Sequence, residues 1–199
     1  MADFTNPNAA VNVSTTRGVV GGYFLRAATD VTDLPTAENV STWVPSDAWT
    51  NLGYIPEDGF TEGVEFADTT ELRDINLDVV DSSTGAATET LTVTLMEMNA
   101  RALAMEFGSE NVTDEKGVIT VNHDWSKLNE EHAYVLRLIL KNGRKWNKFI
   151  PKGKVTSVGE FTGNATTAAQ RQVVLTYIKP DKGAACQDFM ESNDTTPTV

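Results

Sequence analysis

Apolar and polar residues alternate in steps of two along much of this chain, and no other feature restricts its fold as strongly. Residues 90–95 alternate threonine with leucine or valine, and the same period recurs over residues 74–79 and 134–140. Successive side chains of a β-strand point to opposite faces of a sheet. We therefore predict half-buried strands over these segments and a mainly β fold.

A hairpin is expected where residues 134–140 meet Asn142 and Gly143, because these two residue types adopt the positive φ of a tight turn. Residues 144–150 would form the return strand. Two more strands are expected, over 154–161 and 171–178.

One short helix is expected at about residues 99–107. Asn99 can cap its first turn, and Gly108 suits the left-handed conformation that ends many helices. A chain of 199 residues is long enough to bury a single core. We predict an N-terminal arm over residues 1–20, one β domain over 21–179, and a flexible C-terminal tail over 180–199, because both ends lack apolar periodicity.

Charge is distributed unevenly along the chain. Of 28 acidic residues, 16 lie in the first hundred positions beside only three arginines. Residues 132–159 hold seven basic residues and no acidic one. Complementary potentials steer association and fix the register between partners. This pattern favours assembly, with the acidic part of one subunit docked on the basic part of an identical neighbour.

An acidic segment over residues 42–73 is predicted to form a long loop or hairpin arm. It contains prolines and glycines, yet it is rich in aromatic residues that disordered linkers usually lack. We expect these aromatics to pack against another subunit if the chain's own core is too small. The predicted intersubunit contacts are Trp49, Tyr54, Pro56, Glu57, Asp58, Phe60 and Phe66 in the arm, and Arg144, Lys145 and Lys148 in the basic hairpin.

No pattern of catalytic or metal-ligating residues stands out. The glycines near position 20 fit no phosphate-binding loop, and two histidines with Cys186 are too few for a zinc site. Acidic pairs lack the spacing of a calcium loop, although an acidic-site hydrolase stays open as an alternative. We expect no enzymatic activity, no metal and no cofactor. The most apolar run, residues 134–140, is too short for a membrane span, so no membrane insertion is expected.

The basic hairpin supports an alternative function. Residues 137–154 interleave cationic side chains with Trp146 and Phe149, as nucleic-acid-binding surfaces do. The chain could thus be a small β-rich nucleic-acid-binding module. Against this, the net charge of −12 repels phosphates, and lysines at a sheet edge also serve to prevent mispairing.

The order of four stretches resembles the major tail tube proteins of long-tailed bacteriophages with non-contractile tails, the siphophages. These stretches are residues 22–27, residues 49–59, residues 91–98 with the helix that follows, and residues 148–155. The resemblance spans about residues 22–178. It implies a tail-tube β-sandwich or barrel, with the arm at 42–73 reaching an adjacent ring.

The resemblance also implies a function and partners. The subunit would form hexameric rings that stack into a hollow tube, through which phage DNA passes into the host without specific binding. A tape-measure protein, a tail-tip initiation complex and a tail terminator would be its partners. It would be a virion tail protein, made and assembled in the host bacterial cytoplasm, with neither enzymatic activity nor cofactor.

Two polar strand faces are predicted to line that lumen. An uncharged or negative lining would let DNA slide without sticking. The residues concerned are Asp74, Asn76, Asp78, Thr90, Thr92 and Thr94.

Overall fold

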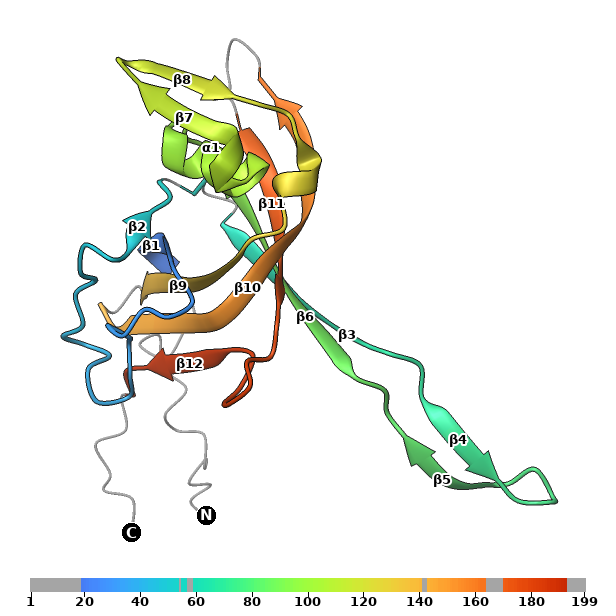
Figure 1. Cartoon of the computed structure of the whole chain (residues 1–199). Helices are drawn as coiled ribbons and strands as arrows, with labels where there is room; N and C mark the ends of the chain where they lie inside the picture. The colour runs from blue at the N-terminus through green and yellow to red at the C-terminus, as the bar shows by residue number, and fades with distance from the viewer. Residues whose placement is uncertain (1–18, 54, 57–58, 141–142, 164–169, 193–199) are drawn as a thin grey trace, which may run out of the picture.

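The computed structural model describes residues 19–53, 55–56, 59–140, 143–163 and 170–192, which form a mainly β structure with one α-helix (Figure 1). The strands are β1 (Val19–Ala27), β2 (Thr50–Asn51), β3 (Phe60–Phe66), β4 (Thr70–Arg73), β5 (Val79–Ser83), β6 (Ala87–Leu95), β7 (Val112–Glu115), β8 (Val118–Val121), β9 (Glu131–Leu140), β10 (Lys145–Thr162), β11 (Gln170–Tyr177) and β12 (Gln187–Met190). The helix is α1 (Ala100–Phe107).

One antiparallel sheet forms the body of the subunit. Its strand order is β2-β1-β9-β10-β11-β6-β3, with β12 added beside β10. The sheet is not closed, because β2 and β3 lie at its two ends. The predicted hairpin between β9 and β10 is confirmed, and Gly143 has the expected positive φ of 81°.

Strand β10 is 18 residues long and joins the two halves of the sheet. Its first part pairs with β12 on one edge, and from Gly153 onward the pairing on that edge passes to β11. Its register with β9 shifts between Ile150 and Gly153. Pro151 lies within this irregularity, where its missing N–H costs no regular ladder bond.

The main core lies between the two halves of the curved sheet. Leu91, Val93 and Leu95 of β6 are buried there, as their alternation predicted, and Phe24 stacks on Tyr134 with ring centroids 5.7 Å apart. Met105 of α1 closes the same core.

A second, smaller core covers the opposite face of β1 and β9. It is built by residues 28–49, here called the strap, whose Trp43 and Trp49 meet edge to face. Asp33 holds both indoles: its carboxylate accepts a hydrogen bond from Trp43 Nε1 at 2.9 Å, and its carbonyl accepts one from Trp49 Nε1 at 2.8 Å. The strap is therefore packed on its own subunit.

Helix α1 forms as the sequence predicts. The Asn99 side chain accepts a hydrogen bond from Ala102 N at 2.8 Å, which satisfies one of the free N–H groups of the first turn. Gly108 follows the helix with a φ of 93° and donates its N–H to the Ala104 carbonyl. This conformation would be strained for a residue with a Cβ.

Three segments differ from the sequence-based predictions. The half-buried strand expected over residues 74–79 is wrong, since Ile75 is 97% exposed at a turn between β4 and β5. The acidic arm expected over 42–73 divides into the packed strap, strand β3 of the sheet and the start of a projecting hairpin. Within the range expected as a flexible tail, residues 187–190 form β12 against β10.

Candidate assembly interface

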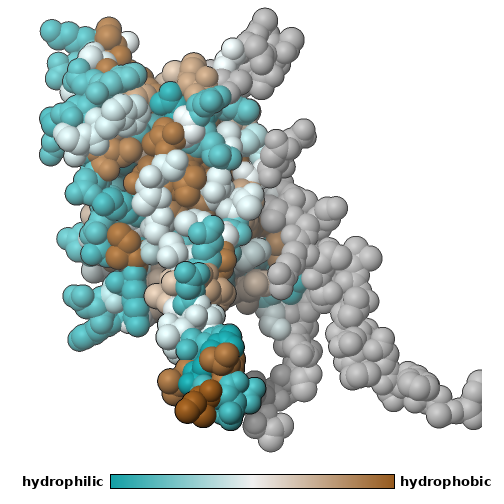
Figure 2. Space-filling model, turned by 90° about the vertical axis from the view of Figure 1, so that its right-hand side faces the viewer, coloured by the Kyte–Doolittle hydropathy of each residue, from teal (hydrophilic) through white to brown (hydrophobic). Residues whose placement is uncertain are grey.

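A two-stranded hairpin leaves the body of the subunit and carries exposed apolar side chains. We call residues 64–86 the arm; it extends from the paired ends of β3 and β6, and the β4–β5 pair forms its tip (Figure 1). Figure 2 shows apolar side chains among hydrophilic ones where the arm points toward the viewer. The exposed apolar residues include Val64, Phe66, Leu72, Ile75, Leu77 and Val80. Exposing so many is unfavourable, so the arm has a surface that another molecule could bury.

The tip of the arm has a defined turn. The Asp74 carboxylate accepts hydrogen bonds from the backbone N–H groups of Asn76 and Asp78, both at 2.9 Å. Arg73 donates to the Leu77 carbonyl at 3.0 Å and pairs with Glu71. The turn therefore presents Ile75 and Leu77 outward from an ordered backbone.

A buried cation anchors the root of the arm. The Lys148 side chain on β10 is 3% exposed, and its Nζ lies 2.9 Å from both a Glu62 carboxylate oxygen on β3 and an Asp188 carboxylate oxygen on β12. The Tyr177 hydroxyl also donates to Glu62, at 2.9 Å. We call these four residues the Lys148 cluster. It ties the four strands β3, β10, β11 and β12 together where the arm leaves the sheet.

Lys148 keeps its charge at neutral pH. Burial by itself would lower the pKa of Lys148, but hydrogen bonds to Asp188 and Glu62 outweigh that effect and raise the pKa. Burial raises the pKa of the neighbouring Cys186 thiol to about 12, although Lys148 opposes this. The thiol is thus protonated near pH 7 and is a poor nucleophile.

An apolar pocket of about 410 Å³ lies beside α1, far from the arm. We call it the α1 pocket; its walls are formed by Met98, Leu103, Glu106, Phe107, Ile119, Val121, His123, Phe161 and Arg171. The Arg171 guanidinium lies between two aromatic rings, 5.1 Å from the centroid of Phe107 and 5.4 Å from that of Phe161. Its Nη1 is 3.6 Å from a carboxylate oxygen of the buried Glu106, longer than a hydrogen bond.

Glu106 should make the stability of the subunit fall as pH rises. Burial raises the pKa of Glu106 from 4.5 to about 7, although Arg171 opposes this. The carboxyl is therefore more easily ionised in the unfolded chain, so folding loses stability between pH 4.5 and 7. Replacing Glu106 with glutamine should remove a pH dependence of about 2 kcal/mol between pH 5 and 8. Urea unfolding of the unassembled subunit at a series of pH values measures it.

The matched control is Glu110→Gln, on an exposed carboxylate 3.7 Å from Lys127. This variant should keep the pH slope of the parent chain, because exposed pairs contribute little to stability. Parallel stability curves for the parent and the Glu106→Gln variant would contradict the prediction.

A family model described as phage tail tube protein matches residues 9–199. The chain belongs to this family. Its members build the tubes of phage tails, so this tail tube protein has a structural role in the virion. A search of curated proteins found no match.

Solved structures similar to this tail tube protein include a chain of the PVC sheath-tube complex, from an extracellular contractile injection system in the extended state. It has 13% identity and a TM-score of 0.43, over 90% of this chain and 95% of that chain. A chain of the anti-feeding prophage cap has 13% identity and a TM-score of 0.44, over 96% and 99% of the two chains.

The contact residues predicted in the acidic segment 42–73 of this tail tube protein fall in several places. Trp49 is buried in the strap, and Phe60 packs at the edge of the main core. Pro56 is half-buried before β3, whereas Phe66 is exposed on the arm. Tyr54, Glu57 and Asp58 lie outside the described residues. Of the predicted contact residues that the structure describes, only Phe66 lies on the arm. The alternating pattern alone did not show that the other apolar side chains of the arm are exposed.

The predicted basic contacts bind within their own chain. Lys148 is buried in its cluster, Lys145 donates to the Ser41 carbonyl, and Arg144 donates to the Glu191 carbonyl at 3.0 Å. Arg137 lies over the Trp43 ring, 5.6 Å from its centroid. These cations make contacts that stabilise their own subunit, which weakens the alternative of a nucleic-acid-binding patch over 137–154.

The six predicted lumen residues form two separate groups. Thr90, Thr92 and Thr94 lie half-exposed on the polar face of β6, and Thr61 of β3 and Val174 of β11 flank Thr92 on that face. By contrast, Asp74, Asn76 and Asp78 belong to the turn at the arm tip. The two groups share no face of the sheet.

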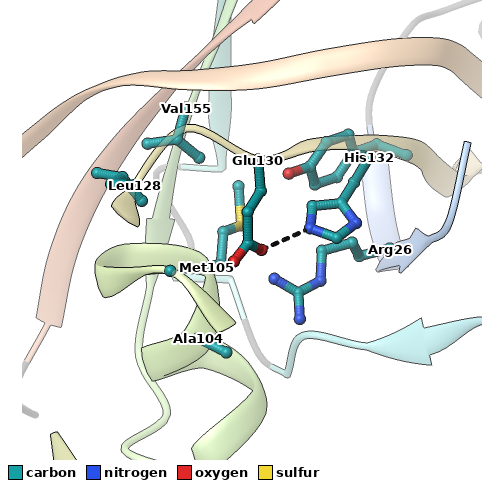
Figure 3. A pocket seen from close by; sticks show the side chains of 9 residues that line it. Arg26, Ala104, Met105, Leu128, Glu130, His132 and Val155 are labelled. Carbon is teal, nitrogen blue, oxygen red and sulfur yellow. Dashed lines mark hydrogen bonds and ion pairs between the residues drawn. The ribbon is translucent and has the colours of Figure 1, made fainter. Parts of the chain in front are cut away.

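A second cavity, of about 10 Å³, lies on the other side of α1 (Figure 3). Its volume suits one water molecule at most. Glu130 accepts hydrogen bonds there from Ser109 and lies 2.9 Å from His132 Nε2. The described residues contain no cluster of potential metal ligands, and no helix among them is long and apolar enough to cross a membrane.

Proposed function

We propose that this protein polymerises into stacked hexameric rings that form the tail tube, the conduit for phage DNA. The arm carries this proposal: it holds apolar side chains such as Ile75 and Leu77 away from any core of its own subunit. A neighbouring subunit would bury them, and hydrophobic burial is the main driving force of association.

The open sheet supports closure into a ring. Strands β2 and β3 end the sheet, and an exposed strand edge is a template for pairing with another chain. Pairing the edge of one subunit with the opposite edge of the next is a heterologous contact, which closes into a ring when the rotation fits.

The threonine face of β6 is the proposed lumen lining. Thr90, Thr92 and Thr94 carry no charge. A ring of six chains, each with a net charge of −12, would have a net charge of −72. Lys154, which pairs with Thr176 in the neighbouring strand, is a positive group at its margin. DNA would meet mostly neutral or repulsive surface and slide without specific binding.

The remaining parts of the proposal follow from the resemblance. A tape-measure protein would occupy the lumen during assembly, a tail-tip complex would initiate the tube and a terminator would end it. Assembly would take place in the host bacterial cytoplasm, in a non-contractile tail. Imaging of whole virions tests the last point, since a sheath around the tube would contradict it.

Electron microscopy of the purified protein over a range of concentration and salt tests the proposal. We expect hollow tubes of uniform width, with six-fold end views. Titration of the same samples with duplex and single-stranded DNA should show no binding at low salt. A monomer that persists at high concentration, or salt-sensitive DNA binding, would contradict it.

A further inference from the structure

The arm tip and the α1 pocket have complementary surfaces. The tip exposes Ile75 and Leu77, whereas the α1 pocket is a mainly apolar hollow whose wall also holds the Arg171 cation and the buried Glu106 carboxyl. Its volume, about 410 Å³, falls in the range of roughly 300–1,000 Å³ in which proteins bind compact ligands. Each is an apolar surface that its own chain leaves uncovered.

Charge on the two surfaces is also complementary. Residues 68–81 contain five acidic residues and one arginine, and the Asp78 carboxylate makes no hydrogen bond or ion pair with the described residues. In the α1 pocket, Arg171 Nε and Nη1 are buried, and no described residue accepts a hydrogen bond from them. A buried guanidinium with unmet donors favours an incoming carboxylate.

The two surfaces lie at opposite ends of the subunit. Figure 1 shows α1, β7 and β8 at the upper end and the β4–β5 tip pointing away at the lower end. A tip therefore cannot reach the pocket of its own chain without refolding. Complementary patches at opposite ends give a head-to-tail contact, which propagates along a stack.

The backbone of the tip is held in one unusual shape. Leu77 has a φ of 69°, which is uncommon for a residue with a branched side chain. Arg73 holds the Leu77 carbonyl, and Asp74 fixes the turn around it. Strain that neighbouring groups maintain often marks a recognition surface.

We propose that the arm tip of one subunit binds in the α1 pocket of the next subunit along the tube, with Ile75 and Leu77 among the apolar walls and Asp78 facing Arg171. This contact rests on the proposed tube function and specifies its partner surface. It also takes Asp74, Asn76 and Asp78 out of the lumen and into the interface.

Cysteine cross-linking tests the contact on the full chain. Ile75→Cys subunits are mixed with Met98→Cys subunits, since both positions are exposed, and treated with a short bis-maleimide. The matched control replaces the second variant with Val44→Cys, another exposed apolar position on the strap. The unsubstituted chain, with its half-buried Cys186, gives the background.

We expect at least about tenfold more covalent dimer from the Ile75–Met98 pair than from the control pair, because a bound tip raises the effective thiol concentration. A chain carrying both substitutions should give a ladder of covalent oligomers. Equal yields from the two pairs would overturn the contact, whether or not tubes form. Microscopy of the same samples separates the hypotheses: tubes without the specific product reject this contact alone, whereas absence of tubes rejects the proposed function.

Discussion

Replacing Lys148 with methionine should lower the free energy of unfolding of the unassembled subunit by about 3 kcal/mol. Methionine has an unbranched side chain one atom shorter than that of lysine and carries no charge. Glu62 and Asp188, each 2.9 Å from the ammonium, would then face each other without the cation between them. Urea unfolding, followed by tryptophan fluorescence, measures the loss.

The matched control is Lys152→Met. Lys152 also pairs with a carboxylate at 2.8 Å, that of Glu131, but both side chains are about one-third or more exposed. Its loss should cost less than about 1 kcal/mol, because water already solvates the pair. Adding Glu62→Gln to Lys148→Met should recover part of the stability. Equal losses for the two lysine variants would show that burial of Lys148 does not decide the effect.

Local signals in the sequence predicted most of the body of the subunit. The alternation in β6 gave the correct buried residues, since Leu91, Val93 and Leu95 face the main core. Asn99 and Gly108 marked the two ends of α1. These features depend on interactions between neighbours in sequence, so the residue types alone indicate them.

The arm was not predictable in the same way. Residues 74–79 alternate as a half-buried strand does, but the structure leaves Ile75 and Leu77 in water. Alternation shows that a segment has one apolar face; it does not show which molecule covers that face. A strand with a core of its own and a strand that binds a neighbour can have the same pattern.

The charge pattern identified oppositely charged segments, but it did not identify the residues that pair. It predicted that the acidic part of one subunit docks on the basic part of a neighbour, which stays a prediction; the Lys148 pairs with Glu62 and Asp188 lie within one chain. Pairing at that level depends on which strands become neighbours, and residues 62, 148 and 188 are far apart in sequence. The hydrogen bonds within the strap could not be predicted from the sequence for the same reason. Asp33 accepts hydrogen bonds from two tryptophans that only the folded loop brings together.

Deleting the arm tip should abolish tube formation and leave the subunit folded. The deletion removes residues 68–85 and joins Ala67 to Ala86 through Asn-Gly. These two alanines already face each other, since Ala67 N donates to the Ala86 carbonyl at 3.0 Å. Asn-Gly favours the two-residue turn that such a hairpin needs.

The stability of the shortened subunit should change by less than about 1 kcal/mol, because substitutions and losses at exposed positions rarely cost more. A deletion of residues 56–66 would be a poorer test. It would remove Phe60 from the edge of the core and Glu62 from the Lys148 cluster, so failure to assemble could follow from misfolding.

A second variant keeps the arm and replaces Leu72, Ile75, Leu77 and Val80 with serine. Light scattering and electron microscopy compare assembly of the parent chain, the shortened chain and this variant at equal concentration. If apolar burial drives stacking, both variants should stay unassembled under conditions where the parent forms tubes. Tubes from the serine variant but not from the shortened chain would mean that arm length and backbone pairing suffice. Normal tubes from the shortened chain would contradict any role of the arm in stacking and would leave the sheet edges as the surfaces that build the tube.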